Sequence, residues 1–359
     1  MNLASFALSV LALCLLPAQA AAQLVSTQEH ALNVVNVTEG LEFPWGLAFL
    51  PDGRMLVTER VGRLRIVEAS GALREHPVRG VPGVDATDQG GLLDIALHPR
   101  FRDNRLLYLS YSALGEGGRG TEVLRARLGD GALENVEVIF RLEPKSPPAA
   151  HYGSRLAFDA DGFLYITLGD RKAAARAQSL DDHAGKIIRL HDDGRAPADN
   201  PFGNPAKHGI FTLGHRNVQG AARHPVSGRI WIVEHGEDEN DRLIVLANGG
   251  NYGWPHGRPT AAGVAPSVHA WTPTIAPSGL TFYSGEKFPK WKGDAFLGSL
   301  KDRMLVRLKL EGDRVVGEEH LLKGMLGRIR DVRTGPDGFL YLLVDDRNGK
   351  LVRLEPADR

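Results

Sequence analysis

A histidine, an aspartate and several cationic side chains are the residues of this sequence best suited to chemistry. His151 begins the segment His-Tyr-Gly-Ser-Arg, and Asp170 ends a strand-like run further along the chain. A histidine can act as a general base near neutral pH when a carboxylate such as Asp170 orients its ring. Several cations directed at one cavity would suit a ligand that carries several carboxylates or phosphates. The cationic candidates are Arg216, Lys301, Arg328 and Arg330.

These residues stand at similar places, near the starts of strand-like runs or in the loops before them. Gln89 lies before one such run, and Arg216 and Asn217 open another. A single arginine, lysine or histidine is more often a solvated or structural residue than a ligand. The recurrence at matching positions is what favours a shared site, provided that the fold brings the runs together.

The strand-like runs belong to a pattern that the chain repeats six times. Each copy has an apolar run, a turn with Asp-Gly or an equivalent, and a second apolar run. Alternation of apolar and polar residues on both sides of such a turn indicates a β-hairpin. The copies span residues 46–67, 92–112, 155–170, 220–236, 279–310 and 332–354.

The repeats predict an all-β fold, a six-bladed β-propeller of four-stranded antiparallel blades that occupies residues 23–359. One hairpin cannot bury its faces alone, whereas radial stacking of blades buries them and leaves only short edges. Residues 31–37 are predicted to complete the last blade. The inner strands of a propeller start around one channel, which would gather the polar candidates. The alternative is two stacked β-sandwich domains, although no linker rich in Pro, Ser or charge separates two halves.

Composition excludes several classes of protein. Lys and Arg together number 43, as do Asp and Glu, so the formal net charge is zero. A polybasic nucleic-acid binder is therefore excluded. The apolar fraction of 43% and the charged fraction of 24% are those of a globular protein, which excludes wholesale disorder.

Residues 1–22 are predicted to be a signal peptide. Leu8–Leu16 is an apolar run, and Ala18 and Ala20 are small residues that suit cleavage after Ala20 or Ala22. We therefore expect a periplasmic or secreted protein, the alternative being an uncleaved N-terminal anchor. No later stretch approaches the roughly 20 apolar residues of a transmembrane helix, so no membrane span is expected.

Cys14 is the only cysteine, and it lies within the predicted signal peptide. Cleavage would leave the mature chain without a thiol. The mature chain would then have no disulfide, no cysteine nucleophile and no thiolate metal site, so its stability must come from a packed core.

Segments along nearly the whole mature chain resemble the soluble quinoprotein sugar dehydrogenases, the glucose/sorbosone dehydrogenase family. The resemblance is closest to the aldose sugar dehydrogenase branch. The most specific segments are GLLDIALHP (91–99), HYGSRLAF (151–158), GHRNVQG (214–220), NYGWP (251–255), APSGLTFY (276–283) and RIRDVRTGPDG (328–338). So many motifs in this order argue against a chance match.

The resemblance implies a six-bladed propeller that binds pyrroloquinoline quinone (PQQ) and calcium at one end of the channel. It implies oxidation of aldose sugars at the anomeric carbon to lactones, with hydride transfer to the quinone. His151 would take the proton from the anomeric hydroxyl while Asp170 holds its imidazole. PQQ is a planar tricarboxylate, which accords with arginine and lysine partners. The residues that would hold it are Gln89, Arg216, Asn217, Lys301, Arg328 and Arg330.

The resemblance also implies metal ligands, with two departures from the family pattern. Calcium at the cofactor would be held by the backbone carbonyls of Gly236 and Glu237, where the family usually has Gly-Pro. There it would polarise the quinone oxygen as a Lewis acid. A second, structural calcium would use the carbonyl of Tyr252, but Arg242 stands at the position of its glutamate ligand.

The expected partners are an aldose sugar and an electron acceptor of unknown identity, with the protein acting as a monomer or a homodimer. Two other functions remain open. A lactonase-type propeller hydrolase would need several acidic or Asn side chains around a metal, whereas the predicted blade starts carry His, Arg and Lys. A non-catalytic ligand-binding scaffold would be a family member that has lost its cofactor, and the altered calcium positions are consistent with that.

Overall fold

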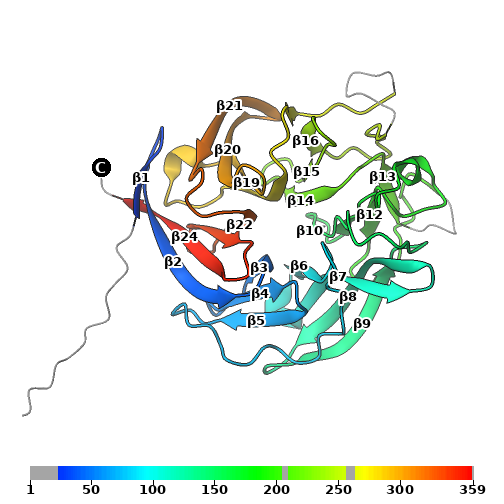
Figure 1. Ribbon diagram of the computed structural model, residues 1–359, viewed down its shortest axis with the longest axis horizontal. Helices are drawn as coiled ribbons and strands as arrows, with labels where there is room; N and C mark the ends of the chain where they lie inside the picture. The colour runs from blue at the N-terminus through cyan, green and yellow to red at the C-terminus, as the bar shows by residue number, and fades with distance from the viewer. Residues whose placement is uncertain (1–22, 204–208, 256–262, 358–359) are drawn as a thin grey trace, which may run out of the picture.

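The computed structural model describes residues 23–203, 209–255 and 263–357, and this part of the chain is almost entirely β-structure. Its strands form six sheets arranged around a central channel (Figure 1). The prediction of an all-β, six-bladed propeller is confirmed, and the alternative of two stacked sandwiches is wrong. The predicted signal peptide, residues 1–22, lies outside the described residues.

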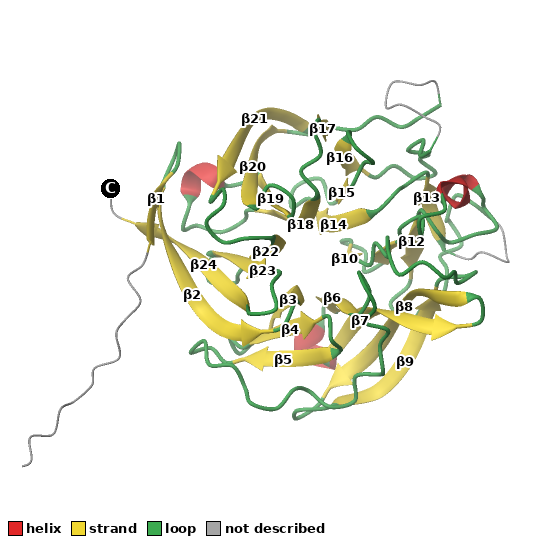
Figure 2. Ribbon diagram, viewed as in Figure 1, coloured by secondary structure: helices red, strands yellow, loops and turns green. Residues whose placement is uncertain are grey.

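Every sheet is antiparallel, and in five of the six the strands follow one another in chain order from the channel outward (Figure 2). The sixth sheet also contains the first two strands of the chain. The first blade contains β3 (Pro44–Phe49), β4 (Met55–Glu59) and β5 (Arg63–Val67). The second blade contains β6 (Leu92–Leu97), β7 (Leu106–Gly115), β8 (Gly118–Leu128) and β9 (Leu133–Arg141). The third blade contains β10 (Leu156–Phe158), β11 (Leu164–Thr167), β12 (Lys186–Leu190) and β13 (Ile210–Leu213).

The remaining three blades repeat this arrangement. The fourth blade contains β14 (Val218–Arg223), β15 (Ile230–Glu234), β16 (Asp241–Val245) and β17 (His269–Trp271). The fifth blade contains β18 (Pro277–Phe282), β19 (Ala295–Ser299), β20 (Met304–Glu311) and β21 (Arg314–Leu321). The sixth blade contains β22 (Ile329–Thr334), β23 (Leu340–Val344), β24 (Gly349–Ala357), β2 (Ala31–Leu41) and β1 (Gln23–Ser26).

Helical structure in the described residues is short. It consists of α1 (Phe101–Asn104) and of 3₁₀ turns at Ala174–Gln178 and Pro289–Trp291. Among these residues, no helix combines the length and the apolar content needed to cross a membrane.

The ring closes without a covalent bond because the two ends of the chain share the sixth blade. β2 pairs antiparallel with β24, from Ala31 opposite Ala357 to Leu41 opposite Gly349. The inner strand β22 in turn contacts β3 of the first blade. The prediction that residues 31–37 complete the last blade is therefore confirmed (Figure 1).

Two blades depart from the predicted four strands. The first blade has three, and an isolated bridge between Leu64 and Val78 takes the place of a fourth. Pro77 and Pro82 lie close to this bridge, and proline lacks the N–H that a strand ladder requires. The sixth blade has five strands because β1 pairs with the outer side of β2.

Apolar side chains fill the spaces between neighbouring blades. Trp231 of the fourth blade, for example, packs in one cluster with Leu280 and Leu297 of the fifth, and all three are at most 2% exposed. Full burial of one large apolar side chain contributes about 1.5–3 kcal/mol. This packing fixes the blades relative to one another and so holds the inner strands around the channel.

Candidate functional site

In five of the six blades, the inner strand has one extra residue near its start, relative to the second strand of the same blade. The register shifts lie between Pro44 and Leu47, Leu92 and Ile95, Val218 and Gly220, Pro277 and Leu280, and Ile329 and Asp331. A bulge of this kind changes the direction in which a side chain points. Four residues within these shifts, Trp45, Leu93, Gln219 and Arg330, line one cavity. The bulges therefore build its floor.

The cavity has a volume of about 660 Å³ and brings together six of the predicted site residues. These six are Gln89, His151, Asn217, Lys301, Arg328 and Arg330. Arg216 lines a neighbouring cavity of about 460 Å³ with Gly236 and Glu237. His235 lines both cavities, so the two are adjacent.

His151 and Asp170 form a close polar pair at this cavity. Nδ1 of His151 lies 2.7 Å from Oδ1 of Asp170. Asp170 is itself held by Trp254, whose Nε1–H donates to Oδ2 at 2.8 Å, and by the backbone N–H of Lys172 at 2.9 Å. A carboxylate at Nδ1 keeps the ring proton there and leaves Nε2 as the acceptor of the neutral imidazole. His151 can therefore accept a proton from a molecule in the cavity.

The backbone around His151 adopts a conformation that directs its ring. His151 and Ser154 have φ angles of 53° and 80°, which are uncommon for residues that carry a side chain, and Gly153 has a φ angle of 64°. The N–H of His151 donates to Oε1 of Gln89 at 2.9 Å, and the N–H of Gly153 donates to Oδ1 of Asn217 at 3.2 Å. Gln89 and Asn217, predicted as cofactor ligands, therefore also hold the segment that carries His151.

Two cations of the cavity, Arg330 and Arg328, are held by one buried carboxylate. Nη2 of Arg330 donates to Oδ2 of Asp345 at 2.6 Å, and Nε and Nη2 of Arg328 lie 3.4 Å from the same oxygen. Although burial raises it, Arg330 and Arg328 hold the pKa of Asp345 below its ordinary value. Lys301 donates through Nζ to Thr274 at 3.0 Å. An ammonium has three donors, so Lys301 retains donors for an anionic ligand.

Arg60, in the turn after β4, is a further cation of the cavity. Its Nη1 donates to the carbonyl of Asp88 at 2.7 Å. Burial lowers the pKa of Arg60, and the nearby Arg330 and Arg328 act in the same direction. The lining carries four cationic and three acidic side chains in all, and Asp345 is already paired. The lining therefore keeps a net positive charge, which favours the binding of an anion.

Sequence reasoning missed Trp45, Arg60, Trp254 and Asp345. Asp345 had a detectable signal, because it follows the second strand of its blade as Asp170 does. Trp254 lies in NYGWP, one of the segments that carry the family resemblance, yet the sequence indicated no role for it or for Trp45. Arg60 had no signal, since an arginine in a turn is usually solvated.

The pH dependence of activity should reflect the environment of His151. Burial lowers its pKa, the bond to Asp170 opposes this effect, and Arg216 lowers the pKa further, so the net shift is downward. The neutral, proton-accepting ring should therefore persist below the ordinary histidine pKa of about 6.5. We expect the acid limb of a kcat/KM profile to be centred below that value. A limb centred above it would contradict this environment for the base.

Tyr252, the predicted ligand of a structural calcium, does not present a free carbonyl. Its carbonyl accepts Nη1–H of Arg242 at 2.8 Å, and Nη2 of Arg242 also pairs with Glu234. His215 lies 3.1 Å from the other oxygen of Glu234. Although burial raises it, Arg242 and His215 lower the pKa of Glu234 to about 2. A guanidinium occupies the place expected for a metal, so these residues do not fit a second calcium.

Arg242→Met should destabilise the fold by about 3–5 kcal/mol, because it leaves the buried carboxylate of Glu234 without its cation. Urea unfolding followed by circular dichroism measures this change. The double variant Glu234→Gln/Arg242→Met removes both charges and should recover much of the loss. An unchanged unfolding free energy in Arg242→Met would show that the pair does not stabilise the fourth blade.

Comparison with known proteins finds similarity along nearly the whole chain. A sequence model of the family described as Glucose / Sorbosone dehydrogenase matches residues 41–353. An aldose sugar dehydrogenase of Escherichia coli is 40% identical, over 91% of this chain and 94% of the relative. The crystal structure of a glucose dehydrogenase superposes with a TM-score of 0.87 at 43% identity, over 90% of this chain and 99% of the other. The PQQ-bound form of an aldose sugar dehydrogenase from Streptomyces coelicolor superposes with a TM-score of 0.79 at 29% identity, over 90% and 98%.

Proposed function

The chain belongs to the glucose/sorbosone dehydrogenase family, and from this membership we propose that it oxidises aldose sugars to lactones with PQQ and calcium as cofactors. The relatives named as sugar dehydrogenases favour an oxidoreductase over the hydrolase and scaffold alternatives. One observation carries the proposal. The pair of His151 and Asp170, 2.7 Å apart, adjoins the cavity that also contains Lys301, Arg328 and Arg330.

The residues of the cavity fit PQQ by charge. Three carboxylates require cationic or amide donors, and a planar ligand can lie against an aromatic side chain such as Trp45 on the floor. The residues that would hold PQQ are Gln89, Arg216, Asn217, Lys301, Arg328 and Arg330, with Arg60 as an additional cation. When bound, PQQ supplies the quinone that accepts the hydride.

Gly236 and Glu237 would offer backbone carbonyls to calcium beside this cavity. Their loop is anchored by Asp241, whose Oδ1 accepts the N–H of Gly236 at 2.7 Å. Its Oδ2 accepts the N–H groups of Ile275 and Ala276, each at 2.7 Å. Calcium prefers oxygen ligands, backbone carbonyls included, and when bound it supplies a Lewis acid. The described residues contain no group of three or more His, Cys, Asp or Glu side chains suited to a metal, so backbone carbonyls are the donors proposed.

The chain's own part in the reaction is to bind, orient and deprotonate the sugar. Nε2 of His151 would take the proton of the anomeric hydroxyl, because Nδ1 is engaged with Asp170. The carboxylate of Asp170 would stabilise the imidazolium that forms, while Trp254 and Lys172 keep that carboxylate in place.

A simple reconstitution tests the proposed function. Purified apoprotein supplied with PQQ and calcium should reduce a redox dye when an aldose is added, and it should not do so without PQQ. Folding is checked by circular dichroism in the same samples. A folded protein that reduces no dye with any member of an aldose panel would contradict the proposal.

We also propose that residues 1–22 direct export to the periplasm or the medium. The mature protein would act there on free sugars as a monomer or a homodimer and pass electrons to an acceptor still to be identified. Cell fractionation and N-terminal sequencing of the mature chain test this part. A cytoplasmic protein that retains residues 1–22 would contradict it.

A further inference from the structure

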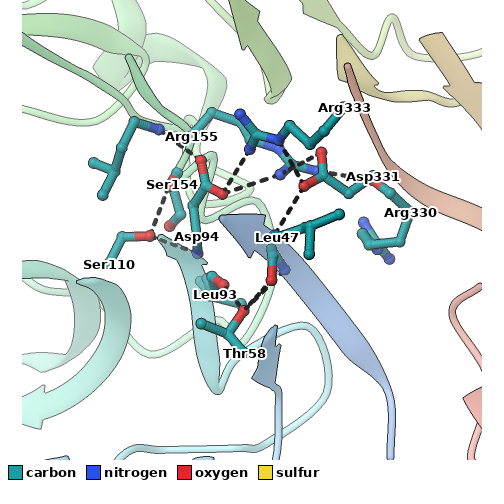
Figure 3. A network of polar contacts seen from close by, with 12 residues as sticks. Leu47, Thr58, Leu93, Asp94, Ser110, Ser154, Arg155, Arg330, Asp331 and Arg333 are labelled. Atoms are coloured by element: carbon teal, nitrogen blue, oxygen red, sulfur yellow. Dashed lines mark hydrogen bonds and ion pairs between the residues drawn. The ribbon is translucent and has the colours of Figure 1, made fainter. Parts of the chain in front are cut away.

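A network of buried charges connects the inner strands β6 and β22 with the segment before β10 (Figure 3). The side chains of Asp94 on β6 and Asp331 on β22 are 0% exposed. They are neutralised by Arg155, which is 1% exposed, and by Arg333, which is 22% exposed. Arg333 also lines a separate cavity of about 640 Å³ at the other ends of the inner strands. The network therefore separates the two ends of the channel.

One guanidinium joins this network to the floor of the candidate site. Nη1 of Arg155 lies 3.2 Å from Oδ1 of Asp94 and 3.0 Å from Oδ1 of Asp331. Its Nε donates to the carbonyl of Gln219 at 2.7 Å, and its Nη2 donates to the carbonyl of Arg330 at 2.8 Å. These partners lie on the second, sixth and fourth blades, whereas Arg155 itself precedes β10 of the third.

Arg155 also contacts the first blade. Its guanidinium carbon lies 4.0 Å from the ring centroid of Trp45. Trp45, Gln219 and Arg330 are three of the four bulge residues that line the cavity, and Nη1 of Arg330 donates to Oε1 of Gln219 at 2.9 Å. A single buried side chain therefore holds three residues of the cavity floor.

We infer that Arg155 is a positioning residue for the cofactor, an inference that rests on the proposed function. The carbonyls of Gln219 and Arg330 accept bonds from Arg155, while their side chains line the cavity. A planar guanidinium holds five N–H donors in a rigid fork, whereas the ammonium of lysine has three donors on a flexible stem and does not reproduce that geometry. Without that fork the two carbonyls lose their donor and the bulges can relax.

Arg333 provides a control that separates positioning from general stability. Its guanidinium bonds the same two carboxylates, Oδ1 of Asp94 at 3.0 Å and Oδ2 of Asp331 at 2.9 Å. Its side chain makes no hydrogen bond to a described residue of the candidate-site cavity. Arg333→Met and Arg155→Met therefore remove the same charge from the same carboxylates, but only Arg155→Met disconnects the floor.

The test compares Arg155→Met, Arg155→Lys and Arg333→Met in the full chain. PQQ is titrated into each apoprotein, and kcat and KM for an aldose are measured on the loaded protein. We expect both Arg155 variants to raise the Kd for PQQ about tenfold or more, the equivalent of one lost bond to a charged group. They should also lower kcat more than they raise KM. Arg333→Met should lose thermal stability yet keep a Kd and a kcat close to wild type.

Hydrogen exchange of the apoproteins adds a measurement that needs no cofactor. The backbone amides of residues 217–220 and 329–332 should exchange faster in Arg155→Lys and at the wild-type rate in Arg333→Met. Wild-type affinity and turnover in Arg155→Lys, or an equal loss in Arg333→Met, would overturn the inference. If the wild type itself binds no PQQ, the proposed function fails instead, and the exchange rates alone decide the role of Arg155.

Discussion

His151→Ala is expected to lower kcat for aldose oxidation by roughly 10²–10⁴-fold, the usual contribution of a positioned general base. The substitution removes the ring whose Nδ1 lies 2.7 Å from Asp170 and whose Nε2 is the proposed proton acceptor. PQQ affinity should change little, because the carboxylates of the cofactor are assigned to arginine and lysine side chains. Dye reduction by the loaded protein measures kcat, and titration of the apoprotein measures PQQ affinity.

His269→Ala is the matched control for this prediction. His269 lies on β17, the outer strand of the fourth blade, and its Nε2 lies 2.9 Å from a carboxylate oxygen of Glu318. It is therefore a second histidine paired with a carboxylate, but it does not line the cavity. Near-normal turnover in His151→Ala would show that another group is the base. An equal loss in His269→Ala would attribute the effect to folding.

The double variant Lys301→Ala/Arg328→Ala is expected to weaken PQQ binding by roughly 10²–10⁴-fold. Each lost hydrogen bond to a charged group contributes about 1.5–3 kcal/mol, and the two losses add if the groups bind separate carboxylates. Both side chains line the cavity. Arg328 is 46% exposed and bonds Asp345 only at 3.4 Å, so its loss should cost little stability. Titration of the apoprotein and thermal unfolding measure the two effects.

Arg303→Ala/Lys323→Ala is the corresponding control. Both residues are exposed, the N–H of Gly324 bonds the carbonyl of Arg303, and neither side chain lines the cavity. This pair removes the same formal charge near the same end of the fifth blade. A comparable loss of affinity in both double variants would indicate a long-range charge effect. Unchanged affinity in Lys301→Ala/Arg328→Ala would place the carboxylates of the cofactor elsewhere.

The sequence determined the architecture because the contacts that define each blade are local. Leu342 pairs with Val352, for example, across a short turn between β23 and β24, and alternation on either side of such a turn is visible in one dimension. Repetition of the hairpin then requires neighbours to cover its faces, which leads to a ring. The equivalence of blade starts likewise predicted that His151, Lys301 and Arg328 would share one end of the channel, as they do.

Only the tertiary structure decided which side chains work together. Arg155 bonds the carbonyls of Gln219 and Arg330, which are 64 and 175 residues away along the chain. The bulges that expose those residues each shift a strand by one position, and such a shift reverses the face on which the following side chains lie. Alternation is the same on either face, so the sequence pattern could not reveal the shift. The pairing of Arg242 with Tyr252 was hidden for a similar reason, because a guanidinium can replace a metal only where packing brings the carbonyl to it.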